Sequence, residues 1–113
     1  MSAGRDFTPA AKRAIRKRSG GVCEGCAQDE ATEYHHRKFK SRGGYGTVAN
    51  GLHLCGWGNH TGCHGKAHSA EPPPGWALNS WDDPLLVKVS LHFGTVYIDN
   101  SGAYLPPDSI PTF

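Results

Sequence analysis

Four cysteines and seven histidines in 113 residues constrain this chain more than any other feature. Cys23 and Cys26 are separated by two residues, and Cys55 and Cys63 by seven. Two thiolates at the shorter spacing bind one tetrahedral zinc ion within a tight turn, and Gly25 eases that turn. Because Cys55 and Cys63 complete a set of four thiolates, the sequence predicts a structural Zn²⁺ site.

The fourth ligand of this zinc has two candidates. The insert between Cys55 and Cys63 is longer than in the usual zinc knuckle, and it contains His60, which competes with Cys63 for the position. A structural metal is expected because the chain is only 37% hydrophobic and carries 15 Gly and 8 Pro. Zinc contributes about 10 kcal/mol or more to the folding of small zinc modules.

The histidines predict a second metal site. His64 and His68 are four residues apart, so they share one face of a helix and can bind the same metal. His35 and His36 are adjacent and point to opposite faces of a strand, so one can coordinate a metal while the other faces a different part of the site. Two further histidines fit ordinary core or surface positions: His53 and His92.

Charge is distributed unevenly along the chain. Residues 1–66 hold 11 Lys and Arg against 5 Asp and Glu, whereas residues 67–113 hold one Lys against five acids. The basic half carries the candidate metal sites, which points to a polyanion such as DNA as partner, although a solvated basic helix without a partner explains the charge equally well. The chain contains neither a run of about 18 apolar residues nor a signal peptide, so we expect no membrane segment and a cytoplasmic location with reduced cysteines.

Local patterns predict short elements within one α+β domain over residues 1–113. Thr8 and Pro9 predict the start of a basic helix within residues 7–19, before Gly20. The other expected elements are strands at 32–36 and 52–54, a helix at 63–69, and in the tail strands at 85–93, 96–98 and 103–105 with a turn at 94–95. The expected architecture is a core at 23–70 followed by a C-terminal β-hairpin at 84–105.

Four segments, in their order along the chain, resemble the HNH endonucleases: Tyr34-His35-His36-Arg37, Ser41-Arg42-Gly43-Gly44, Asn50-Gly51-Leu52-His53-Leu54-Cys55 and Gly62-Cys63-His64-Gly65-Lys66-Ala67-His68. That family has a ββα-metal (His-Me finger) core of two strands, a loop and a helix. Its motif residues match His36, Asn50 and His64, and its four-Cys variant folds a zinc finger around the motif. The resemblance covers residues 23–68, and the tail is similar to that of short HNH proteins from phages and actinobacteria.

The resemblance implies a catalytic site. The adjacent histidines are similar to those of colicin-type DNases, in which the first is a metal ligand and the second a general base. On that basis His35, His64 and His68 bind a catalytic divalent metal (Mg²⁺, Mn²⁺, Ni²⁺ or Zn²⁺), and His36 activates water to hydrolyse a DNA phosphodiester bond. Asn50 orients His36 or the loop between the strands, or touches the metal.

Contacts with DNA are expected in the loop between the two strands. Four basic residues there are expected to bind backbone phosphates without reading sequence: Arg37, Lys38, Lys40 and Arg42. Trp57 either packs against the zinc loop or stacks on a base, and packing is favoured. No residue stands out for base-specific reading.

Two alternatives to an independent nuclease stay open. One is a non-catalytic, zinc-stabilised module that binds nucleic acid. The other is a nuclease subunit that is active only with a protein partner, docked through the acidic tail. The resemblance to phage proteins implies such a partner in the large terminase of DNA packaging, and a location in the bacterial host cytoplasm.

Overall fold

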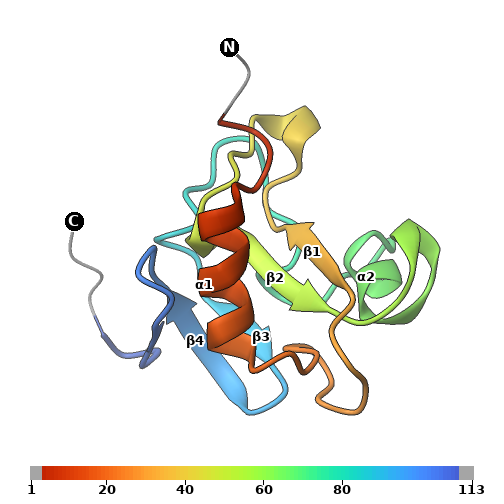
Figure 1. Ribbon diagram of the computed structural model, residues 1–113. Coiled ribbons are helices and arrows are strands. Elements are labelled where there is room, and N and C mark those ends of the chain that lie inside the picture. Colours follow the sequence, from red (N-terminus) through yellow and green to blue (C-terminus); the bar gives the residue numbers. More distant parts are fainter. Residues whose placement is uncertain (1–3, 110–113) are drawn as a thin grey trace.

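A pair of antiparallel strands lies at the centre of the structure, with one helix crossing it and a second helix beside it (Figure 1). The structure is a computed structural model and describes residues 4–109. The strands are β1 (Glu33–His36) and β2 (Gly51–Leu54), and the helices are α1 (Pro9–Ser19) and α2 (Gly62–Ala67). This mixture of short helices and antiparallel strands confirms the expected α+β class.

A second antiparallel sheet follows in the tail. Its strands are β3 (Val89–Leu91), β4 (Gly94–Ile98) and β5 (Tyr104–Leu105), and they lie in the order β3-β4-β5. The turn expected at residues 94–95 is wrong, because Leu91 pairs with Gly94 and the two-residue turn is therefore 92–93. Three single turns of 3-10 helix lie in the loops: η1 (Lys40–Arg42), η2 (Val48–Asn50) and η3 (Gly58–His60).

The observed elements differ from the expected ones mainly at their ends. The basic helix expected within residues 7–19 is α1, and the helix expected at 63–69 is α2, which begins and ends earlier. The first tail strand begins at Val89 rather than at residue 85. Of the expected single domain, residues 1–3 and 110–113 lie outside the described part. Within residues 4–109, no helix has the length and apolar character needed to cross a membrane.

Capping groups explain where α1 begins and ends. Thr8 Oγ1 accepts a hydrogen bond from the backbone N–H of Ala11 (3.1 Å), and Pro9 takes the first helical position, where a missing N–H costs nothing. Gly20 ends the helix in the left-handed conformation (φ 68°), and its N–H donates to the carbonyl of Arg16 (2.8 Å). The sequence pattern predicted both ends of α1 through these local groups.

Two apolar clusters join the elements. The larger one packs β2, α2 and the second sheet together, and it includes Leu52, Leu54, Trp76, Val89 and Ile98. The smaller one lies under α1, where Ala11 and Ile15 pack with Phe7 against Tyr34 and Val48. Since α1 contributes only two buried apolar side chains, apolar burial holds it weakly.

An ion pair between Arg18 and Glu24 anchors the C-terminal end of α1. Both side chains are 1% exposed, and the guanidinium meets the carboxylate at 2.7 and 2.8 Å. Glu24 lies between Cys23 and Cys26, and its carboxylate also accepts hydrogen bonds from the backbone N–H of His53 and the hydroxyl of Tyr104. One fully partnered carboxylate therefore connects α1, β2 and β5, and loss of Arg18 would leave its buried charge uncompensated.

Arg37 is completely buried, so the prediction that it contacts DNA phosphates is wrong. Its guanidinium donates hydrogen bonds of 2.8 to 3.0 Å to four backbone carbonyls, those of Ala49, Gly75, Pro84 and Val87. Burial lowers its pKa to about 10, which still leaves it charged at neutral pH. The side chain fastens the segment before β3 to the core and has no exposed atom with which to meet a phosphate.

We expect Arg37→Met to lower the free energy of unfolding by about 3–5 kcal/mol, because it fills similar volume but leaves four carbonyls without their donor. Urea unfolding of the zinc-loaded protein, followed by circular dichroism, measures the loss. Arg42→Met is the matched control: Arg42 is exposed and donates to the carbonyl of Leu78, so its loss should stay within about 1 kcal/mol. Equal losses in the two variants would show that Arg37 does not hold the tail.

Candidate metal centres

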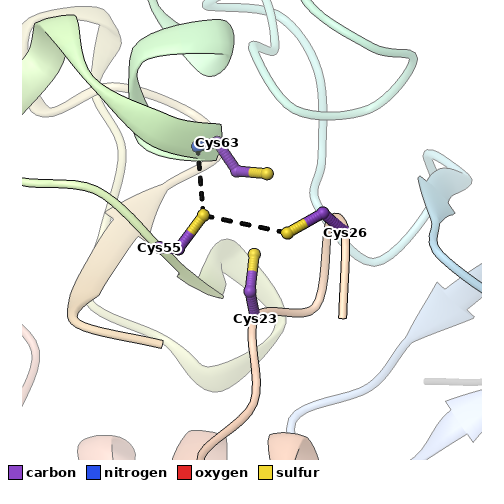
Figure 2. Close-up of side chains that lie close together, drawn as sticks. All are labelled: Cys23, Cys26, Cys55 and Cys63. Atoms are coloured by element: carbon purple, nitrogen blue, oxygen red, sulfur yellow. Dashed lines mark hydrogen bonds between the residues drawn. The ribbon is translucent and has the colours of Figure 1, made fainter. Parts of the chain in front are cut away.

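The sulfur atoms of the four cysteines converge on one point where β2, α2 and the segment Cys23–Cys26 meet (Figure 2). All four Sγ atoms lie within 4.8 Å of one another, and those of Cys26 and Cys55 are 3.8 Å apart. Tetrahedral zinc with Zn–S bonds of about 2.3 Å places its sulfurs about 3.8 Å apart. The cluster therefore has the dimensions of a four-thiolate zinc site.

Backbone contacts bring the two halves of this thiolate cluster together. The N–H of Cys23 donates to the carbonyl of Asp29 (2.9 Å), which closes the turn that carries Cys26. Cys55 directly follows β2, and Cys63 lies in the first turn of α2. The N–H of Cys63 donates to the Sγ of Cys55 (3.4 Å), so the start of α2 sits against the sulfur that ends β2 (Figure 2).

Two glycines leave no room for a side chain at this point. A Cβ on Gly25 would lie 2.4 Å from the ring of Trp76, so the Cys23–Cys26 turn packs directly under the indole. Gly56 has a φ of +109°, and a Cβ there would lie 2.2 Å from the carbonyl oxygen of Thr61. The long insert between the last two cysteines therefore closes on itself tightly.

The charge balance of the thiolate cluster calls for a cation. Burial and the adjacent Cys23 raise the pKa of Cys63, and burial raises the pKa of Cys55. Burial also opposes ionisation of Cys26, but the backbone N–H of Gln28 and the neighbouring thiols lower its pKa to about 7. Four crowded sulfurs become thiolates together only when a bound cation neutralises them, so the donor set fits a metal such as zinc.

The structure decides between Cys63 and His60 as the fourth ligand. Cys63 is buried and supplies the fourth sulfur of the cluster. His60 is exposed at the end of η3, within the insert. The wide spacing between Cys55 and Cys63 is therefore accommodated by looping out the insert, with no exchange of ligand.

A second cluster consists of three imidazoles. His35 lies on β1, His64 lies in α2, and His68 is the residue at which α2 ends. Each offers a ring nitrogen within 4.8 Å of the others, and their ring centroids are 5.0 to 5.2 Å apart. The sequence prediction that His35 joins the helical pair is thus matched by their placement in space.

Hydrogen bonding leaves nitrogens of this imidazole cluster free. His35 Nε2 lies 2.6 Å from the carbonyl of Trp76, and a ring nitrogen that donates to a carbonyl leaves the other with a lone pair. In the described part of the chain, His64 Nδ1 is a buried nitrogen without a hydrogen-bond partner, and Glu33 Oε1 lies 3.9 Å from it. A bond to a metal would satisfy this nitrogen, so the residues present fit a metal site.

The imidazoles of the cluster favour the neutral form. Burial lowers the pKa of His35 to about 3, although its hydrogen bond to Trp76 acts in the opposite direction. Burial and mutual repulsion lower the pKa of His64, and burial with the nearby His60 lowers that of His68. Neutral imidazole is the form that coordinates a metal, so the cluster needs no deprotonation at neutral pH.

His36, the expected general base, lies outside the imidazole cluster. It points to the face of β1 opposite to His35, stacks on Phe7 with ring centroids 4.1 Å apart, and places Nε2 2.6 Å from the carbonyl of Arg5. Burial lowers its pKa. It borders an open depression of about 410 Å³ that Lys12 also lines.

Asn50 serves the loop between β1 and β2. Its Oδ1 accepts from the backbone N–H of Lys38 (2.7 Å), and its Nδ2 donates to the carbonyls of Lys38 (3.1 Å) and Tyr45 (2.9 Å). The residue is 1% exposed, and both ends of its amide are engaged in these bonds. Of the alternatives for Asn50, the structure favours orientation of the loop over contact with His36 or with a metal.

The other three residues expected to contact phosphates lie nearer the surface than Arg37. Lys38 is half-buried, and Lys40 is exposed but paired with Asp6. Arg42 is exposed, with its guanidinium 4.7 Å from the centroid of the Phe39 ring. The exposed face of α1 adds further cations: Lys12, Arg13, Arg16 and Lys17.

The sequence pattern missed two acidic residues with central positions. Glu24 lies inside the Cys-x2-Cys turn and forms a buried ion pair with Arg18, which precedes it by six residues. Glu33 accepts a hydrogen bond from the N–H of Gly58 (2.6 Å) and lies beside His64. Because Glu33 precedes His35 by two residues on β1, the alternation of a strand placed both on one face.

Two histidines have the ordinary roles expected of them. His53 is buried, with its Nδ1 2.7 Å from the hydroxyl of Ser19 and its ring stacked on Tyr34. His92 is exposed in the turn between β3 and β4. Neither ring belongs to the imidazole cluster.

We expect the purified protein to retain one zinc ion per chain that depends on Cys63. Cys63→Ser should lose that zinc and the cooperative thermal transition, because the metal stabilises so small a core. His60→Ala is the control and should retain both. Elemental analysis after dialysis and a melting curve measure the two properties. Zinc loss in His60→Ala equal to that in Cys63→Ser would contradict the four-thiolate assignment.

We expect the zinc-loaded protein to bind one further divalent metal at the imidazole cluster. Titration calorimetry with Ni²⁺ should show one site, and His64→Ala should weaken it by roughly 100-fold or more, since even loss of an outer contact to a metal ligand costs 10- to 100-fold. His92→Ala should bind Ni²⁺ as the parent does. Unchanged Ni²⁺ affinity in His64→Ala would rule this cluster out as the site.

Comparisons with protein-family models, with curated proteins and with solved structures gave no match to this chain. The four-cysteine cluster can hold a structural metal such as zinc, and this is evident from the fold without a known relative. Function follows from the chemistry of the two clusters and the residues around them.

Proposed function

We propose that the protein is a metal-dependent endonuclease of the HNH type that hydrolyses DNA phosphodiester bonds. The observation that carries the proposal is the gathering of three imidazoles, from β1, α2 and the residue after α2, beside a four-cysteine cluster. Two strands, an intervening loop and a helix bear these groups, and this order of elements supports the ββα-metal core that the resemblance implies. A purely structural zinc module has no need of the second, imidazole cluster.

The divalent metal of this proposal is held by His35, His64 and His68. When bound, it supplies Lewis-acid stabilisation of the negative charge that develops on the scissile phosphate and the leaving oxygen. Imidazole ligands suit zinc, nickel and other transition metals. Glu33, 3.9 Å from His64, adds negative charge beside the cluster and favours a cation there.

His36 is the general base of the proposal. Its Nε2 donates to the carbonyl of Arg5, so the proton stays on Nε2 and the Nδ1 lone pair is free to accept a proton from water. Stacking on Phe7 holds the ring in one orientation. Asn50 keeps the loop after β1 in place, which positions the backbone that follows His36.

Exposed cations supply the affinity for DNA. Lys12 lines the same depression as His36, and Lys40 borders it. Such side chains bind backbone phosphates at any sequence, and the binding weakens as salt rises. The proposal therefore predicts a nuclease with salt-sensitive binding and little base specificity.

One observation favours a second candidate, a zinc-stabilised module that binds DNA without cleaving it. His36 and His35 point to opposite faces of β1. A phosphate bound at the imidazole cluster would therefore have to extend past the end of β1 to contact His36. In this alternative His36 serves to pack Phe7, and Lys12 and Lys40 bind DNA alone. Cleavage by the parent protein separates the two functions, and the His36 variants then test the role of His36 in cleavage.

We expect zinc-loaded protein supplied with Mn²⁺, Mg²⁺, Ni²⁺ or Zn²⁺ to nick supercoiled plasmid. His36→Ala should slow nicking by about 10²–10⁴-fold, the usual effect of removing a general base. His36→Gln keeps a side-chain donor near the Arg5 carbonyl, so it should fold as the parent does. Slow nicking by His36→Gln would show that the loss in His36→Ala is not caused by unfolding. His92→Ala should cut as the parent does. If the folded His36 variants cut at the parental rate, His36 is not the general base. If no metal supports nicking while DNA still binds, the non-catalytic module is correct.

A further inference from the structure

The indole of Trp57 stands in solvent on a loop whose backbone is held firmly. The residue is 74% exposed, so the packing role favoured for it by the sequence is wrong. Its N–H donates to Thr61 Oγ1 (2.7 Å), and its carbonyl accepts from the same hydroxyl (2.9 Å). An ordered backbone that presents a large bare aromatic ring is suited to contact with another molecule.

The loop that carries Trp57 is tied to the imidazole cluster by one carboxylate. Glu33 Oε1 accepts the N–H of Gly58 (2.6 Å), the residue after Trp57, and the same oxygen lies 3.9 Å from His64 Nδ1. The loop also runs directly into α2, which contains His64 and is followed by His68. The loop at Trp57 is therefore linked through Glu33 to the cluster that binds the scissile phosphate in the proposed function.

We propose that Trp57 stacks on a nucleobase next to the phosphate at the imidazole cluster, and that the preferred substrate is DNA with unpaired bases. This inference rests on the proposed function for the identity of the phosphate site. Aromatic side chains stack on single-stranded bases without regard to sequence, since every base has a π-face. In an intact duplex both faces of a base are covered by its neighbours, so the ring meets a free face only where pairing and stacking are interrupted.

A second exposed tryptophan provides a matched control. Trp81 is 79% exposed, but it precedes Asp82 and Asp83 in the acidic tail. Carboxylates beside the ring repel DNA phosphates, so Trp81 does not share the role of Trp57. Substitution at the two positions removes the same exposed ring and differs only in its surroundings.

The test compares two labelled DNA duplexes of one length, one fully paired and one with a central stretch of mismatched bases. Binding to zinc-loaded protein is measured by fluorescence anisotropy before any further metal is added, so that it does not depend on cleavage. We expect Trp57→Ala to weaken binding to the mismatched duplex by roughly 5- to 100-fold and to leave the paired duplex unaffected. Trp57→Phe should keep most of the preference, and Trp81→Ala all of it.

The outcomes separate this inference from the proposed function. If Trp57→Ala binds both duplexes as the parent does, or weakens both equally, base stacking is refuted, whether or not the protein nicks plasmid. If Trp57→Ala selectively loses the mismatched duplex while no metal supports nicking, stacking stands and the nuclease fails.

Discussion

The meeting of four sulfur atoms at one point is the constraint on which the rest of the structure depends. α2 has six residues, too few to be stable as an isolated helix, and its first turn is held through Cys63. His64 follows Cys63 directly, so the imidazole cluster takes its position from the thiolate cluster. Cys55 directly follows β2, and the Cys23–Cys26 turn closes the other side, so three parts of the chain meet at a single centre. A metal there would organise both the fold and the surface beside it.

Buried charge performs a similar task away from the sulfurs. Glu24 accepts hydrogen bonds from distant segments of the chain, and Arg37 donates hydrogen bonds to others. Both side chains are buried. Desolvating such groups is unfavourable unless every partner is present, so they specify one arrangement of helix, strands and tail more than they add to stability. The ion pair between Glu24 and Arg18 explains how α1, whose buried apolar residues are only Ala11 and Ile15, keeps its place.

Features encoded by neighbouring residues could be predicted, and features that depend on distant residues could not. The cap at Thr8, the cysteine pair at 23 and 26 and the helical pair His64 and His68 are short-range patterns, and the structure places them as expected. Arg37 resembles the basic residues after it in sequence, but it is buried because it donates to distant carbonyls, three of them in the tail. The tail turn was misplaced because strand pairing put it at 92–93, against the local preference of Gly94.

The hydrogen bonds that join the tail to the core affect how the molecule unfolds. The carbonyls of Gly75, Pro84 and Val87 accept hydrogen bonds from the Arg37 guanidinium, and the hydroxyl of Tyr104 donates to Glu24 beside the cysteines. Detaching the second sheet would expose two charged groups and strip them of partners in a single step. The core and the tail are therefore one cooperative unit, and a fragment that ends after α2 would not be a smaller version of this fold. The most protected backbone amides should be found in both sheets alike, and not in the metal-bearing half alone.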